Sequence, residues 1–227
     1  MDVVKVIKDI DGMLRDDEAR CLYNLAKNSA DNIVEIGSWK GKSTVCLALG
    51  TKEKRHGRVY AVDPHKGIRT NCDGLYKGCN TEYEFRDNLK RFNVDDMVVP
   101  LIMESKEAAR GWDKLLSLLF IDGAHDYQNV KQDFDLWFPH LSSGGFICFH
   151  DALYKFGKNY SGIRQVVIDE IFRSRKFANI KICGTMVYAQ KNVEAIDISN
   201  DAISELVYRL SPLLYNPIAL ITNLLGR

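Results

Sequence analysis

Short apolar runs and longer amphipathic stretches alternate along most of this chain. The apolar runs have the length of buried strands, and they lie at residues 33–36, 58–62, 97–102, 115–121, 146–149, 180–183 and 186–189. Apolar side chains with helical spacing occupy residues 16–28, 41–48, 82–92, 106–112, 128–140 and 161–175. The alternation predicts an α/β domain. We expect Asp16 and Asp17 to cap the first helix, and Gly144 and Gly145 to turn into the fifth strand.

The segment from Asn32 to Ser43, NIVEIGSWKGKS, combines a strand, a glycine turn and the start of a helix. This geometry offers backbone N–H groups and a helix dipole to a ligand, and glycine permits a sharp turn or a close approach of the backbone. Glu35 is a polar residue in an apolar run, so it needs a partner. We expect a nucleotide-like ligand here, and the alternative is a plain connection between a strand and a helix.

Two further strand ends carry polar residues. Asp63 follows the second strand, 26 residues after Gly37. An acidic side chain at this place is positioned to accept hydrogen bonds from ribose hydroxyls, and a turn residue before proline is the alternative. Ser105 follows the third strand, where it either touches the base of a nucleotide or caps the next helix.

Carboxylates and imidazoles gather at the ends of the fourth and fifth strands. Asp122 ends the fourth strand, His125 lies three residues later, and His150 and Asp151 end the fifth strand. Ligands bind outside the carboxyl ends of the strands in open α/β sheets. Two carboxylates and an imidazole suit a divalent cation with open positions for substrate. We expect Asp122, His150 and Asp151 to form a metal site, and the alternative is that the strand-end aspartates cap helices.

Composition excludes several other classes of protein. A chain of 227 residues with a net charge of +1 and 46% apolar residues fits one soluble domain, and that charge favours neither nucleic acid nor an acidic membrane. No apolar run reaches the roughly 18 residues of a spanning helix, and no signal peptide is recognised. We therefore expect the six cysteines to be reduced thiols in the cytoplasm.

The segments between and around these elements are expected to shape a pocket. Residues 64–80 form a long loop in which Cys72 and Cys79 fit no metal-binding motif, and residues 152–160 form a polar loop. The expected division of the chain is a helical lid or packing segment at 1–30, the domain at 31–192 and an apolar helical tail at 193–227. The tail is expected to dock on the domain or to form a homodimer through the terminal helices.

Three segments occur in the order VEIGSWKGKST, VYAVDP and LLFIDGAHDYQNVKQDFDLWFPHLSSGGFICFHD. Together they resemble the class I S-adenosylmethionine-dependent methyltransferases, and more narrowly the small O-methyltransferases with a D-G-x-H-x-Y segment and a later H-D pair. The match covers about residues 30–190. The resemblance implies a Rossmann-like, doubly wound sheet of seven strands, mostly parallel with the last antiparallel, and helices on both faces.

The resemblance also assigns the cofactor site residue by residue. The residues implied to bind S-adenosylmethionine are Glu35, Gly37, Ser38, Gly41, Ser43, Asp63, Ser105 and Asp122. The glycine loop would line the methionine end of the cofactor, Asp63 would bind the ribose, and Ser105 would lie near the adenine.

The implied reaction is methyl transfer to a hydroxyl group of a small molecule or sugar, with a phenol or catechol as the second choice of acceptor. His125 would take the proton, since imidazole titrates near neutral pH, and Mg²⁺ or another divalent cation would lower the pKa of the hydroxyl. Metal-dependent relatives have an aspartate matching Asp122 and an acidic or amide pair matching His150 and Asp151. Imidazole favours softer ions than Mg²⁺, so a metal-free site with His150 as the base is the alternative.

Other functional classes explain fewer of these residues. Residues 37–43 are one residue short of the phosphate-binding pattern G-x-x-x-x-G-K-S, and a P-loop-like nucleotide-binding protein would have no role for Glu35 and Asp63. A dinucleotide oxidoreductase would need the third glycine of G-x-G-x-x-G, which is missing. The joint presence of Asp122, His125 and Asp151 argues against a non-catalytic S-adenosylmethionine-binding protein.

Overall fold

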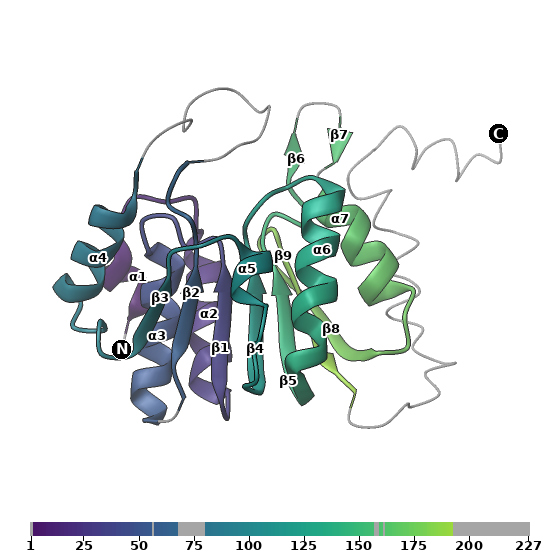
Figure 1. Cartoon of the computed structure of the whole chain (residues 1–227), viewed down its shortest axis with the longest axis horizontal. Coiled ribbons are helices and arrows are strands. Elements are labelled where there is room, and N and C mark those ends of the chain that lie inside the picture. The colour runs from purple at the N-terminus through teal and green to yellow at the C-terminus, as the bar shows by residue number, and fades with distance from the viewer. Residues whose placement is uncertain (1, 56, 68–79, 157–158, 161, 193–227) are drawn as a thin grey trace.

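One seven-stranded sheet runs through the computed structural model, which describes residues 2–55, 57–67, 80–156, 159–160 and 162–192 (Figure 1). The strands follow the order β3-β2-β1-β4-β5-β9-β8 across the sheet. Their bounds are β1 Asn32–Ile36, β2 Val59–Val62, β3 Val98–Leu101, β4 Leu116–Ile121, β5 Leu141–Phe149, β8 Phe177–Cys183 and β9 Met186–Lys191.

Neighbouring strands from β3 to β5 are parallel, and β9 is antiparallel to both β5 and β8. Ile36 lies opposite Val62 and Ile121, and Ile121 lies opposite Phe149, so β1, β2, β4 and β5 end at the same level. The polar residues that follow these strands therefore meet at one edge. The predicted doubly wound sheet with an antiparallel last strand is confirmed.

Helices cover both faces of the sheet. The helices α1 (Val3–Ile7), α2 (Asp16–Asn28), α3 (Lys42–Lys54) and α4 (Glu82–Arg91) share a hydrophobic core with one face. The other core is shared by α5 (Ser105–Ala108), α6 (Tyr127–Trp137) and α7 (Gly162–Val167). Ile33 faces the first core and Val34 the second. Strands buried on both faces have apolar residues at successive positions, which explains the continuous apolar runs of the sequence.

The start of β5 differs from the prediction. The strand begins at Leu141 and contains Gly144 and Gly145, which the sequence analysis placed in a turn. Its pairing with β4 shifts between Leu116 and Leu118, and Gly144 has a φ of +77° at this irregularity. Glycine tolerates this conformation within a strand, so the two glycines produce a bulge and do not end the strand.

Several helix boundaries also differ. The helix α2 ends at Asn28 as predicted, but Arg15 is its N-cap, and the two aspartates lie in the first turn. The helix α5 ends at Ala108, four residues earlier than predicted. The helix predicted at 161–175 divides into α7 and a π-helix at Ile168–Phe172. The polar loop predicted at 152–160 contains two short strands, β6 (Lys155–Phe156) and β7 (Asn159–Tyr160), at the top of Figure 1.

Some predictions fall on residues outside the described part of the chain. These are the roles of Cys72 and Cys79 and of the tail at 193–227. Among the residues that the structure describes, no helix has the length and apolar character needed to cross a membrane. The described cysteines, Cys21, Cys46, Cys148 and Cys183, are free thiols.

Candidate functional site

The glycine loop after β1 lies directly against the end of β4. The Asp122 N–H donates a hydrogen bond to the Ile36 carbonyl at 2.8 Å. Gly37 has a φ of +88°, and a Cβ at this position would lie 2.2 Å from the carbonyl oxygen of Asp122. Gly41 has a φ of +86°, precedes α3 and would bring a Cβ within 3.1 Å of the Phe85 ring. A left-handed backbone and a close approach both require glycine. These glycines therefore allow the loop after β1 to lie against Asp122 at the end of β4.

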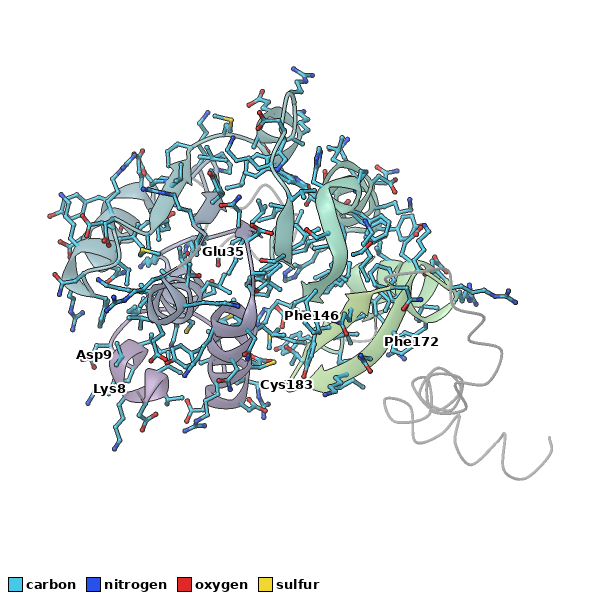
Figure 2. The ribbon with its side chains drawn as sticks, turned by 90° about the horizontal axis from the view of Figure 1, so that it is seen from below. Lys8, Asp9, Glu35, Phe146, Phe172 and Cys183 are labelled. Carbon is cyan, nitrogen blue, oxygen red and sulfur yellow. The ribbon has the colours of Figure 1, made fainter. Side chains whose placement is uncertain are left out.

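Glu35 connects β1 to the first turn of α3. Its side chain is fully buried and lies in the middle of the molecule, whereas Lys8 and Asp9 lie at the outline (Figure 2). The hydroxyls of Ser43 and Thr44 each donate to one carboxylate oxygen at 2.5 Å. Burial and, to a smaller extent, the charges of nearby aspartates raise the pKa of Glu35 to about 8 despite these two donors. The partner expected for this buried polar residue is therefore a pair of hydroxyls.

The raised pKa of Glu35 predicts a pH-dependent stability. The folded state keeps a proton on Glu35 up to about pH 8, whereas the unfolded chain loses it near pH 4.5, so unfolding releases a proton between these values. The free energy of unfolding should therefore fall with rising pH in this window, by up to about 1.4 kcal/mol per pH unit. Urea unfolding at several pH values should show that Glu35→Gln makes this slope less steep by the contribution of one proton. An identical slope in both proteins would contradict the assignment.

Asp63 connects the end of β2 to the glycine loop. One carboxylate oxygen accepts the Trp39 N–H at 2.8 Å, and the other accepts the His65 N–H at 2.7 Å. Each oxygen keeps a second lone pair for another donor. The nearby Ser38 side chain is buried, and its hydroxyl has no hydrogen-bond partner among the described residues. A buried hydroxyl without a partner is costly, so this part of the loop fits a polar ligand.

Ser105 does not cap a helix. Glu104 is the N-cap of α5, and the Ser105 hydroxyl accepts the indole N–H of Trp137 at 2.8 Å. The same hydroxyl bonds to the buried Asp133, whose pKa is raised to about 6 by burial. Ser105 therefore ties α5 to α6, which neither sequence interpretation foresaw, and its place near an adenine stays a prediction.

Asp122, His125 and Asp151 come together at the carboxyl edge of the sheet. One ligand atom from each side chain lies within 4.8 Å of the others. The His125 Nε2 atom is 3.8 Å from a carboxylate oxygen of Asp151. Asp151 follows β5 with a φ of +51°, an unusual backbone conformation for a residue other than glycine. The three residues come from the two strand ends that the sequence analysis selected.

His150 is buried and contacts two residues of this cluster. Its Nδ1 atom is 3.1 Å from the Asp122 carboxylate and 3.5 Å from that of Asp151, and its Nε2 atom is 3.2 Å from Glu18. Burial opposes a charge on His150, but the surrounding carboxylates, Asp122 foremost, raise its pKa well above the ordinary value. The ring thus lies between carboxylates that favour its protonated form.

The predicted roles of His150 as a metal ligand and as a base stay predictions. Its two ring nitrogens face the carboxylates of Asp122 and Glu18. His125 lies beside Asp122 and Asp151 in the group of candidate ligands.

Glu18 is the residue of the site that sequence reasoning missed. It lies on α2, is fully buried and bonds to His150. Burial raises the pKa of its carboxyl, but the hydrogen bonds from His150 and from backbone N–H groups outweigh burial and hold it at about 2. The available signal was its spacing, because Glu18 precedes Leu22 by one helical turn and shares the apolar face of α2.

The chain matches one protein-family model and is similar to a viral protein. A family model described as a methyltransferase domain matches residues 34–152, slightly more than half of the chain. The uncharacterized protein R132 of Acanthamoeba polyphaga mimivirus is 29% identical over 120 residues, which are 52% of this chain and 50% of that protein. The chain thus spans about half the length of this relative.

Solved structures share the fold at low sequence identity. An O-methyltransferase from Bacillus cereus in complex with SAH has a TM-score of 0.58 and 17% identity, with 83% of this chain and 89% of that chain covered. The O-methyltransferase TomG from Streptomyces achromogenes in complex with SAM has a TM-score of 0.58 and 13% identity, with coverage of 84% and 86%. The SAH-bound methyltransferase PaMTH1 of Podospora anserina has a TM-score of 0.62 and 11% identity, with coverage of 85% and 86%.

Proposed function

Because the chain belongs to the methyltransferase domain family, we propose that it transfers a methyl group from S-adenosylmethionine to a hydroxyl group of a small molecule or sugar. The observation that carries this proposal is the cluster of Asp122, His125 and Asp151 beside the glycine loop. Family membership removes the P-loop and dinucleotide alternatives. The acceptor class rests on the O-methyltransferases that share the fold.

The residues of the glycine loop fit the proposed cofactor. Among the residues that the structure describes, the Ser38 hydroxyl has no partner and each carboxylate oxygen of Asp63 accepts one backbone N–H, so both residues can bind a polar ligand. Glu35 and Ser43 bond to each other, so their proposed role is to fix the start of α3. Bound S-adenosylmethionine supplies a methyl group that is already activated by the positive sulfur, and the protein must orient the acceptor and remove its proton.

His125 is the proposed base. The acceptor oxygen attacks the methyl carbon, the carbon–sulfur bond breaks with its electron pair passing to sulfur, and the hydroxyl proton passes to the imidazole of His125. Asp151, 3.8 Å from Nε2, orients this ring and stabilises its charged form. The products are the methyl ether and S-adenosylhomocysteine.

The same cluster is suited to a divalent cation. Asp122, His125 and Asp151 offer two carboxylates and one imidazole, a donor set that first-row divalent ions accept. A bound cation would lower the pKa of the acceptor hydroxyl. Asp122 and Asp151 would hold it, and His125 would either complete the ligand set or remain the base, because a nitrogen bound to metal cannot accept a proton.

The proposal predicts methyl transfer that depends on divalent cations. With radiolabelled S-adenosylmethionine and a panel of a simple glycoside, a catechol and a phenol, we expect labelled product from at least one acceptor. Removal of cations with EDTA should lower the rate by about 10–100-fold, and Mg²⁺, Mn²⁺ or Zn²⁺ should restore it. Asp151→Asn should reduce this activation, and Asp135→Asn, an exposed carboxylate on α6, is the control.

Two outcomes would change the proposal. Transfer that is insensitive to EDTA would leave His125 as the base of a metal-free site. Cofactor binding without transfer to any acceptor of a broadened panel would favour the non-catalytic S-adenosylmethionine-binding protein.

A further inference from the structure

The carboxylate of Glu18 joins three separate segments of the chain. One oxygen accepts the N–H and the hydroxyl of Thr185, in the turn between β8 and β9, at 2.7 Å and 2.8 Å. The other oxygen accepts the Arg15 N–H at 2.9 Å and lies 3.2 Å from Nε2 of His150. Hydrogen bonds with charged groups at such distances are strong, and a fully buried carboxylate needs all of them.

The turn between β8 and β9 is shaped around this carboxylate. Gly184 has a φ of +60°, and a Cβ at this position would lie 2.4 Å from an oxygen of Glu18. Only glycine admits both this backbone conformation and this approach. Gly184 and Thr185 therefore form a cradle that fixes the Glu18 side chain from the side opposite to α2.

Glu18 reaches both carboxylates of the proposed catalytic cluster through one intermediate each. His150 connects it to Asp122 at 3.1 Å. The hydroxyl of Thr185 lies 3.2 Å from the Asp151 carboxylate. Asp122 and Asp151 thus each lie next to a group that Glu18 also contacts, and His125 lies near both carboxylates.

We propose that Glu18 is a positioning residue for methyl transfer, which holds His150 and Thr185 so that Asp122 and Asp151 keep their orientation toward His125. The inference rests on the proposed function, and it adds α2 to the site. Glu18 precedes the residues that the family model matches, which begin at 34. The matched domain by itself therefore lacks one part of the catalytic arrangement.

The direct test is Glu18→Gln in the full chain. An amide keeps the size of the side chain but replaces one acceptor oxygen with an NH₂ group. Since each oxygen of Glu18 accepts a backbone N–H, one from Arg15 and one from Thr185, the NH₂ group would face a donor in either orientation of the amide. We expect turnover of the acceptor found above to fall by about tenfold or more, with KM for S-adenosylmethionine within about twofold of the native value. Asp16→Asn, which removes an exposed carboxylate from the same helix, is the matched control and should keep native turnover.

A second readout does not depend on turnover. In the native protein, NMR of ¹⁵N-histidine-labelled samples should show two slowly exchanging ring protons on His150, one toward Glu18 and one toward Asp122. Glu18→Gln should lose the proton on Nε2, and Asp16→Asn should keep both. If the native protein transfers no methyl group, the proposed function fails, and this signature alone decides whether Glu18 holds His150.

Thr185→Val covers the case in which Glu18→Gln does not fold. It removes the hydroxyl between Glu18 and Asp151 and should lower turnover severalfold at unchanged KM for S-adenosylmethionine, whereas Thr185→Ser should retain native turnover. Native turnover and both ring protons in a folded Glu18→Gln protein, or native turnover in Thr185→Val, would overturn the proposal.

Discussion

Replacing His125 with alanine is expected to abolish methyl transfer while cofactor binding stays close to that of the native protein. The imidazole is the proposed acceptor of the hydroxyl proton, and a positioned general base contributes about 10²–10⁴-fold to the rate. His125 lies beside Asp151 at the end of β5, whereas hydrogen bonds of the glycine loop join Trp39 to Asp63 and Ser43 to Glu35. Initial rates and calorimetric titration with S-adenosylhomocysteine measure the two effects separately.

The control for this variant is His140→Ala. His140 lies immediately before β5, so it is at the end of the strand opposite to the site, and its removal should leave the rate unchanged. Full activity of His125→Ala would remove His125 from the mechanism. A parallel loss of S-adenosylhomocysteine binding would instead assign the residue to the cofactor site.

Replacing Gly37 with alanine is expected to destabilise the protein strongly and to abolish cofactor binding. The added Cβ would lie 2.2 Å from the carbonyl oxygen of Asp122, at a backbone φ of +88°. Strain in the left-handed region costs about 1–3 kcal/mol, and overpacking adds about 1–3 kcal/mol. The free energy of unfolding in urea should therefore fall by about 2–6 kcal/mol, and the folded fraction should no longer bind S-adenosylhomocysteine.

The variant Gly111→Ala separates the cost of backbone strain from the cost of overpacking. Gly111 has a φ of +72°, and nothing lies within 4 Å of the Cβ position. This variant should show the backbone strain alone, at about 1–2 kcal/mol, with cofactor binding retained. Equal losses of stability in the two variants would show that contact with Asp122 does not matter.

The sequence alone was sufficient to predict the sheet and the strand ends that carry the candidate site. Buried parallel strands are continuous apolar runs, and their ends are marked by polar residues such as Asp63 and Asp122, so both features are local. The number of residues between the ends of β4 and β5 is also read directly from the sequence. These signals placed Asp122, His125 and Asp151 at one edge before any contact was known.

The partners of His150 could not be predicted because they depend on packing between distant segments. Glu18 is 132 residues away in the chain from His150 and 167 from Thr185. The sequence shows that His150 and Asp151 end a strand, but not that the ring of His150 lies between Asp122 and Glu18 of α2. The start of β5 was misplaced for a related reason, since a glycine pair marks a turn or a bulge equally well.

The most direct test of the central claim is calorimetric titration of the purified protein with S-adenosylhomocysteine, with and without Mg²⁺, Mn²⁺ or Zn²⁺. The account predicts binding of one ligand per chain in the micromolar range, and weaker binding after Asp63→Asn. The absence of binding under every condition, together with binding of ATP or NAD, would contradict it.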